Sequence, residues 1–179
     1  QIKVWYNGVT LWEQQKEYQP KAATALIYNQ LAQAYVLEGN FLRDEQKIAQ
    51  IIDYYESAIA IKPDFAGAYY NLGDLYRRLE QWELAKTQFQ RAILYDPEHF
   101  EAYYQLGTLY KHEGRPQEAI AAFRKAIDLI PDNARMYEQV IDVYERQTMD
   151  SESLSLYRAE KQRLLERYRF VFGRAYHSQ

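Results

Sequence analysis

The residues that could do chemistry are few, and they are scattered along the chain. The 179-residue sequence has no cysteine, which excludes disulfides, thiolate metal sites and a cysteine nucleophile. Its three histidines are His99, His112 and His177. None of them has a metal-ligand spacing to another, and His99 is expected to be a solvated histidine in a turn. The sequence therefore predicts no metal site and no cofactor.

The sequence does not supply a catalytic site either. Its 7 glycines are scattered and form no phosphate-binding loop, and no serine has the surroundings of a nucleophile elbow. The carboxylates fall mainly on helix surfaces, where solvation is their default role. A net charge of −3 does not favour nucleic acid. We therefore expect no catalytic residues, no enzymatic activity and no nucleic-acid partner.

A basic and aromatic segment near the C-terminus is a first candidate for binding. Its members are Arg163, Arg167, Arg169, Phe170 and Arg174. One interpretation is contact with an acidic partner or with an anionic membrane surface. The other, which a short charge run favours, is a solvated outer face that Glu160 and Glu166 partly balance. Phe170 has no obvious place on an inward face, and this keeps the binding interpretation open.

An internal repeat shows which elements would position these side chains. Residues 66–99 and 100–133 match at a constant offset of 34 residues. In each unit, four matching positions have the spacing of one helical stripe, and three more form a stripe on a second helix. Each unit is thus a helix–turn–helix that must stack on its neighbours to bury its apolar stripes. The matching pairs are Tyr69 and Tyr103, Leu72 and Leu106, Gly73 and Gly107, Tyr76 and Tyr110, Ala85 and Ala119, Phe89 and Phe123, Ala92 and Ala126, Pro97 and Pro131.

Small residues stand where the two helices of a unit must meet. Gly73 and Ala85 let the helix backbones approach, and Phe89 fills the space beside them. Pro97 and Pro131 end the second helices, because the residue before a proline is pushed out of the α region. This pattern resembles the tetratricopeptide repeat family, including its small-residue and proline columns. The resemblance implies an all-α fold, a right-handed α-solenoid of helix–turn–helix repeats, to which the sequence adds a long C-terminal helix.

The repeat columns also divide the chain into segments. The first repeat carries seven inserted residues, which are expected to lengthen one or both of its helices, with the apolar spacing favouring the second. A degenerate last repeat should end in one helix that begins near Ser151 and has Gly173 as its C-cap. The predicted segments are 1–24, an N-terminal cap or half repeat; 25–65, repeat 1 with the insertion; 66–99, repeat 2; 100–133, repeat 3; 134–173, degenerate repeat 4 with the extended helix; and 174–179, a tail.

In the tetratricopeptide family the first helices line a concave groove that holds extended peptides or helices. The resemblance implies the same surface here. Tyr70 and Tyr104 either anchor a partner there or pack against a neighbouring unit. The side chains expected to face the groove are Asn29, Gln33, Tyr70, Asp74, Arg77, Arg78, Tyr104, Thr108, Lys111, Glu138 and Asp142, with His112 and Arg146 near the helix ends.

Co-chaperone members of the family grip a C-terminal carboxylate with Lys, Arg and Asn on successive first helices. Neither register of this chain supplies that clamp, so binding of chaperone tails is disfavoured. The matching columns hold Asn29, Gln33, Asn71, Glu101 and Gln105, or one unit further on Tyr70, Asp74, Gln105, Arg135 and Gln139.

These observations favour a scaffold or assembly factor that binds a partner protein or peptide in the groove. Two alternatives stay open, a permanent structural subunit of a larger, membrane-associated complex and a regulatory repeat segment of a longer enzyme. No apolar run is long enough to span a bilayer, and the chain begins with Gln1 and not with Met. Membrane contact is therefore expected to be indirect or through a preceding anchor. The sequence specifies neither the compartment, nor the partner, nor the oligomeric state.

Overall fold

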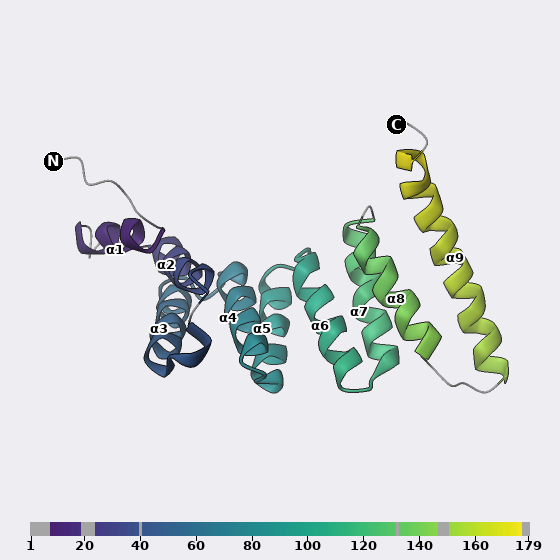
Figure 1. Cartoon of the computed structure of the whole chain (residues 1–179), viewed down its shortest axis with the longest axis horizontal. Coiled ribbons are helices and arrows are strands. Elements are labelled where there is room, and N and C mark those ends of the chain that lie inside the picture. The colour runs from purple at the N-terminus through teal and green to yellow at the C-terminus, as the bar shows by residue number, and fades with distance from the viewer. Residues whose placement is uncertain (1–7, 19–23, 40, 132, 147–150, 177–179) are drawn as a thin grey trace. The chain divides into compact units, whose positions relative to one another are not determined.

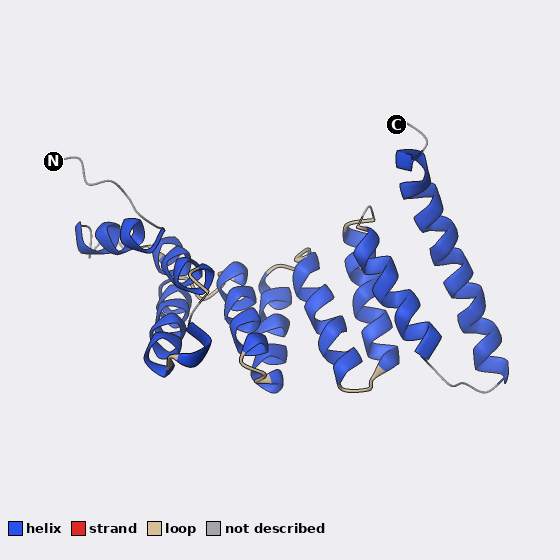
Figure 2. Ribbon diagram, viewed as in Figure 1, coloured by secondary structure: helices blue, strands red, loops and turns tan. Residues whose placement is uncertain are grey.

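The expected all-α architecture is confirmed. The computed structural model describes residues 8–18, 24–39, 41–131, 133–146 and 151–176 (Figure 1). These residues form helices joined by turns, and no strand occurs among them (Figure 2). The elements in chain order are α1 (Gly8–Tyr18), α2 (Ala25–Leu37), the 3-10 helix η1 (Phe41–Arg43), α3 (Glu45–Ile61), α4 (Ala66–Arg78), α5 (Trp82–Tyr95), α6 (Phe100–His112), α7 (Pro116–Leu129), α8 (Ala134–Arg146) and α9 (Ser151–Tyr176).

The helices belong to two compact units, residues 1–97 and 98–179, and each unit is described by itself. In the first unit, α2 pairs with α3 and α4 pairs with α5, while α3 packs on α4. In the second unit, α6 pairs with α7 and α8 with α9, while α7 packs on α8. Each unit is therefore a stack of two helical hairpins, with first and second helices alternating along the chain (Figure 1).

In two hairpins, α4–α5 and α6–α7, the helices meet where a phenylalanine ring lies on a glycine. A Cβ atom added to Gly73 would stand only 2.8 Å from Cδ1 and Cε1 of Phe89. In the second unit, a Cβ on Gly107 would stand 2.6 Å from the same two atoms of Phe123. Both rings are fully buried. The missing side chain thus leaves the space that each ring occupies, as the small-residue column of the sequence predicts.

The buried cores follow the repeat columns. Side chains from α2, α3, η1 and α4 form the main core of the first unit, and side chains from α7, α8 and α9 form that of the second. Ring contacts extend the second core outward, because Tyr168 of α9 packs against Tyr137 with 6.0 Å between the ring centroids. The fully buried large residues are Leu31, Phe41, Ile51, Tyr55, Leu75, Phe89, Leu109, Phe123, Ile127, Met136, Tyr137 and Val140.

The three turns that join α2 to α3, α4 to α5 and α6 to α7 use one backbone conformation at the same repeat position. Gly39, Glu80 and Gly114 all have a positive φ, at 79°, 58° and 69°. The amide of Gln81 donates to the carbonyl of Tyr76 at 2.9 Å, and Arg115 donates to Tyr110 in the same way. These bonds make a Schellman ending, which satisfies carbonyls at the end of a first helix. Such an ending requires a residue with a left-handed backbone conformation. Glycine fills this role in two of these three turns, and Glu80 fills it in the third.

Helix α1 packs on the first hairpin through polar and apolar contacts. One carboxylate oxygen of Glu13 accepts hydrogen bonds from the hydroxyls of Tyr35 at 3.1 Å and Tyr54 at 2.8 Å. The ammonium of Lys16 lies 4.6 Å from the centroid of the Tyr54 ring. Burial and the hydrogen bond to Glu13 raise the pKa of Tyr54. Among the described side chains of α1, the buried Val9 belongs to the core and the partly buried Trp12 packs against it.

The length of α3 and the end of α9 can be compared with the predictions from the sequence. Helix α3 has 17 residues where α5 and α7 have 14, and η1 precedes it in the region of the insertion. The expected end of the last helix at Gly173 is wrong, because α9 continues to Tyr176. A glycine inside a helix costs only about 1 kcal/mol relative to alanine, so without a left-handed conformation it does not stop the helix.

Gly73→Ala is expected to lower the free energy of unfolding by about 1–3 kcal/mol, because the new methyl group overlaps the Phe89 ring. Gly67→Ala on the same helix is the matched control. Its Cβ would meet only the side chain of Phe65, at 3.3 Å, so it should keep the helix-propensity gain of up to about 1 kcal/mol. Urea unfolding followed by circular dichroism compares the two. Equal effects of both substitutions would contradict the packing role of Gly73.

Glu80→Gly is expected to raise the free energy of unfolding by roughly 0.5–1 kcal/mol, because it removes the steric cost of a left-handed non-glycine residue. The reverse change in the equivalent turn, Gly114→Glu, should lower stability. Thermal unfolding of the two variants measures both signs. A loss of stability in Glu80→Gly would show that the Glu80 side chain makes a compensating contact.

Candidate protein-binding surface

The exposed part of α4 carries a compact charge cluster. The carboxylate of Asp74 accepts from Arg77 at 2.7 and 3.0 Å and from Arg78 at 2.7 Å. Burial raises the pKa of Tyr55, which reaches α4 from α3, and the charge of Asp74 raises it further. Three residues that the sequence assigned to the groove are therefore brought together on one helix, with their side chains fixed by ion pairs.

A related cluster lies in the second unit, where it joins two first helices. The Lys111 ammonium of α6 lies 2.5 Å from one carboxylate oxygen of Asp142 on α8, and Arg146 binds the other oxygen at 2.7 Å. Lys111 also donates to the side-chain carbonyl of Gln139 at 2.8 Å. The hydrogen bond from Lys111 and the nearby positive charges hold the pKa of Asp142 below its usual value. Asp142 and Arg146 occupy the same repeat positions as Asp74 and Arg78.

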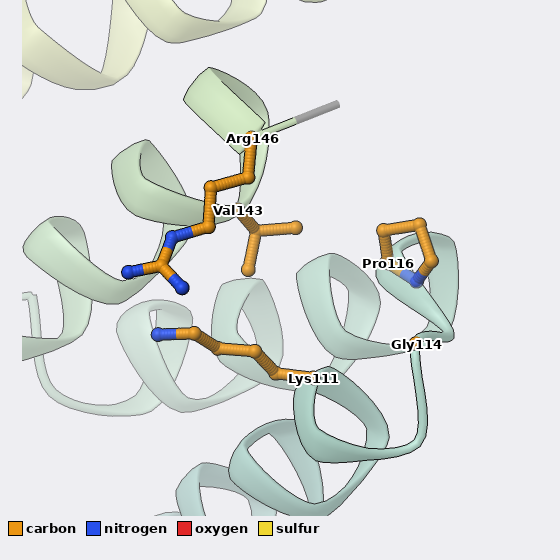
Figure 3. A pocket seen from close by; sticks show the side chains of 5 residues that line it. All are labelled: Lys111, Gly114, Pro116, Val143 and Arg146. Atoms are coloured by element: carbon orange, nitrogen blue, oxygen red, sulfur yellow. The ribbon is translucent and has the colours of Figure 1, made fainter. Parts of the chain in front are cut away.

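A cavity of about 260 Å³ opens beside this second cluster. Figure 3 shows the side chains of Lys111 and Arg146 extending toward each other, with Val143 beside Arg146 and Pro116 on the far side. The aliphatic part of the cavity wall comes from the buried Val143 and from the first turn of α7, which begins at Pro116. The repeat pattern did not identify Gly114, Pro116 or Val143 as lining residues. Gly114, two positions before Pro116, marks the turn in the sequence, but its closeness to α8 depends on the packing of two hairpins.

The two candidate anchor tyrosines are half-buried, and each contacts the phenylalanine of its own hairpin. Tyr70 is tilted against Phe89 at a centroid distance of 5.8 Å, and Tyr104 against Phe123 at 5.6 Å. The guanidinium of Arg135 lies 5.6 Å from the Tyr104 centroid. Each tyrosine therefore covers a core ring with part of its surface and keeps the rest accessible to a partner.

The remaining groove candidates differ in accessibility. Asn29 is buried at 4% exposure, and its carbonyl oxygen accepts a 2.9 Å hydrogen bond from Asn71. The expectation that Asn29 faces a groove is therefore wrong, because the pair bridges α2 and α4 inside the first unit. Gln33 and Thr108 are half-buried, Glu138 is exposed, and the Thr108 hydroxyl donates to the carbonyl of Tyr104 at 3.1 Å.

The basic residues of α9 lie mainly at the surface. Arg163, Arg167, Arg169 and Phe170 are exposed, and the side chain of Arg174 lies outside the part that the structure describes. Arg167 is 3.7 Å from the carboxylate of Asp128 on α7.

His99 differs from its expectation, because its side chain is only 14% exposed and lies 3.1 Å from the Glu101 carboxylate. It is the residue before α6 and packs against the first turn of that helix, so it is not a solvated turn histidine. His112 is exposed, whereas His177 lies outside the described residues. The described residues contain no group of His, Asp and Glu suited to a metal ion. No described helix combines the length and apolar character needed to cross a bilayer.

Comparison with known families agrees with this architecture. A family model described as "Tetratricopeptide repeat" matches residues 70–134, and one described as "TPR repeat" matches residues 39–79. The chain belongs to the tetratricopeptide repeat family. The matches extend from Gly39, just before η1, to the start of α8, and thus include both the glycine–phenylalanine contacts and the proline-terminated second helices of the two regular repeats.

Several solved structures share the fold. The structure titled "Crystal structure of MamA protein" has a TM-score of 0.72 and 21% identity, covering 96% of this chain and 84% of that one. A second, "Crystal structure of MamA", has a TM-score of 0.69 and 22% identity, with 89% and 85% covered. The "First TPR of Spaghetti (RPAP3) bound to HSP90 peptide SRMEEVD" has a TM-score of 0.61 and 18% identity, with 69% and 93% covered. These likenesses show the fold alone. No curated protein sequence matches the chain.

Asp142→Asn is expected to lower the free energy of unfolding by up to about 1 kcal/mol at neutral pH, because it removes the anion shared by Lys111 and Arg146. Since the folded-state pKa of Asp142 is lowered, its contribution is complete above the ordinary aspartate pKa of about 3.9. It is lost as the pH falls through the lowered value. Urea unfolding of both proteins at neutral and acidic pH checks this. Glu138→Gln, an exposed change on the same helix, is the control, and a difference for Asp142→Asn that persists unchanged in acid would contradict the ion-pair origin.

Proposed function

We propose that this tetratricopeptide chain is a scaffold that binds a partner protein or peptide on the accessible side of its first helices. We define this surface, the first-helix face, by the candidate residues that remain accessible. In the first unit they are Gln33, Tyr70, Asp74, Arg77 and Arg78, and in the second Tyr104, Thr108, Lys111, Glu138 and Asp142.

The observation that carries the proposal is the arrangement around Tyr104 and Lys111. Tyr104 is held against Phe123, Lys111 is held by Asp142 and Gln139, and a cavity of about 260 Å³ opens beside Lys111. Side chains that are already fixed lose less conformational entropy when a partner binds. Tyr104 lies on the same helix as Lys111, and an aromatic anchor combined with oriented polar groups has the composition of a binding hot spot.

Family membership supports a binding role, and the solved tetratricopeptide domain in complex with a peptide is an example of it. The same comparison does not extend to the identity of the partner. The sequence columns of this chain lack the Lys, Arg and Asn set that grips a chaperone carboxylate, so a chaperone tail is not the partner that we propose. The partner proposed is a protein segment that presents apolar and polar side chains to the first-helix face.

Tyr70→Ala combined with Tyr104→Ala is expected to weaken partner binding by roughly 30-fold or more, the loss of about 2 kcal/mol that truncating an aromatic anchor causes. Affinity capture from native extract, followed by quantification of each recovered protein, measures this. Tyr95→Ala is the matched control, because Tyr95 is a partly exposed tyrosine on the second helix α5 that stacks on Tyr69. Circular dichroism establishes that all variants are folded.

A site-specific crosslinker tests the same assignment without removing an anchor. A photoreactive phenylalanine analogue at Tyr104 should form covalent adducts with the captured partner, whereas the same analogue at the exposed Gln90 on α5 should not. Retained binding in the folded double variant, together with adducts at Gln90 only, would place the partner elsewhere on the chain and overturn the first-helix face.

A further inference from the structure

The cavity beside Lys111 combines an apolar wall with two cationic side chains. The buried Val143 and Pro116, the first residue of α7, supply the apolar wall. Lys111 and Arg146 line the rest (Figure 3). Gly114 completes the lining without a side chain, and a Cβ atom added there would meet no described heavy atom within 4 Å apart from its chain neighbours. The turn between α6 and α7 therefore borders open space.

The volume of the cavity suits one apolar side chain. At about 260 Å³ it exceeds the roughly 150 Å³ that is enough to hold a benzene ring inside a protein. The cavity is open to solvent, so water is in contact with its apolar wall. An apolar side chain that replaces this water gains free energy, because apolar surface on both partners is removed from solvent.

The guanidinium of Arg146 is bound through one of its three nitrogens. Its Nε donates to Asp142 at 2.7 Å, and within the described part of the chain neither Nη group donates a hydrogen bond. A guanidinium has five N–H groups, of which the two Nη groups carry four. Two parallel N–H groups can bind both oxygens of one carboxylate. Asp142 thus orients the guanidinium and leaves its Nη groups available to a ligand.

The carboxylates near the cavity are bound to cations of the chain itself. Asp142 is shared by two cationic side chains, which gives that cluster a net charge of +1. Glu113 and Glu118, beside the turn, both bind Arg115, at 3.0 and 2.8 Å, which gives that cluster a net charge of −1. The two clusters together are neutral. What the cavity offers to an acidic group is therefore the oriented donors of Arg146 and not a long-range field.

We propose that this cavity extends the first-helix face by receiving one apolar side chain of the partner segment, while the Nη groups of Arg146 bind an acidic side chain of the same segment. The proposal rests on the proposed function and adds to it the pair of residues that the partner presents. Arg146 follows Val143 by three residues, about 4.5 Å along α8. In an extended segment, side chains two residues apart lie on the same side, about 6.6 Å from each other. One residue therefore separates the apolar and the acidic residue of the partner.

This arrangement differs from the carboxylate clamp of the co-chaperone members. Lys111 and Arg146 lie in the last turns of α6 and α8, outside the columns that correspond to the clamp. The ligand of Arg146 is the side chain of an aspartate or glutamate inside the segment, so the partner does not have to present its C-terminus. The neighbouring apolar wall adds a requirement for a leucine-sized side chain.

The test is an NMR titration of the full isotope-labelled chain with short peptides at low ionic strength. The first peptide, made of glycine and serine with capped ends, contains one leucine and one glutamate separated by one residue. A second has glutamine in place of glutamate, and a third has alanine in place of leucine. The amide of Gly114, which lines the cavity, reports binding. The first peptide is expected to bind at least about fivefold more tightly than either of the others, because each of them lacks one of the two contacts.

Arg146→Gln should lower the affinity for the glutamate peptide to that for the glutamine peptide, and it should leave the affinity for the glutamine peptide within about twofold. Arg158→Gln is the matched control, because it removes one positive charge at an exposed position of α9. It should leave the affinity for each peptide within about twofold. Tyr70→Ala with Tyr104→Ala should also keep peptide binding, since neither tyrosine lines the cavity. Circular dichroism establishes that each variant is folded.

Equal binding of the glutamate and glutamine peptides would overturn the proposal, and so would equal effects of Arg146→Gln and Arg158→Gln. A glutamate peptide that binds without shifting the Gly114 amide would place the acidic ligand elsewhere and overturn it as well. Capture of the partner from native extract separates the proposal from the proposed function. If the tyrosine double variant loses the partner while Arg146→Gln retains it fully, the first-helix face stands and the cavity proposal is wrong.

Discussion

The contact between a phenylalanine ring and a helix position that has no side chain is the constraint on which the rest of the fold depends. With Phe89 on Gly73 and Phe123 on Gly107, the two helices of a hairpin approach so closely that a single methyl group has no room. This approach sets the distance between first and second helices. It also fixes the rotation of the first helix about its axis, which decides the residues that face the core and those that remain accessible. The accessibility of the candidate binding residues thus depends on the packing of glycine against phenylalanine, a contact in which they take no part.

On the accessible sides of the helices, ion pairs between neighbouring side chains restrict the side-chain conformations. Asp74 and Asp142 each hold two cationic side chains, one of them four residues further along the same helix. Exposed ion pairs contribute little to stability, typically below about 1 kcal/mol, because solvent screens them and the side chains lose entropy. Their effect here is to restrict the conformations of long side chains on a surface. A partner therefore meets groups that already have defined positions.

The sequence predicted those parts of the structure that repeat. The columns of Gly73, Phe89 and Pro97 recur after 34 residues, and this recurrence determined the hairpins, their buried faces and the ends of their second helices. Contacts between different repeats could not be predicted from the repeated columns. Asn29 was assigned to a groove because the projection of a single helix does not reveal that Asn71 on the next first helix pairs with it. The cavity beside Lys111 and the closeness of Asp128 to Arg167 likewise arise from two elements that no local pattern connects.

The docking of α1 has a consequence for how the first unit opens. Its attachment combines the buried Val9 and the partly buried Trp12 with a carboxylate shared by two tyrosine hydroxyls and a cation over an aromatic ring. Attachments with little apolar burial open with a smaller free energy than a packed hairpin does. Amide hydrogens of α1 are therefore expected to exchange with solvent in a separate and earlier step than those of α2 and α3. The first unit is then a cooperative pair of hairpins with an independently opening segment at its edge, and loss of that segment uncovers Tyr28, Tyr35 and Tyr54 without unfolding the repeats beneath it.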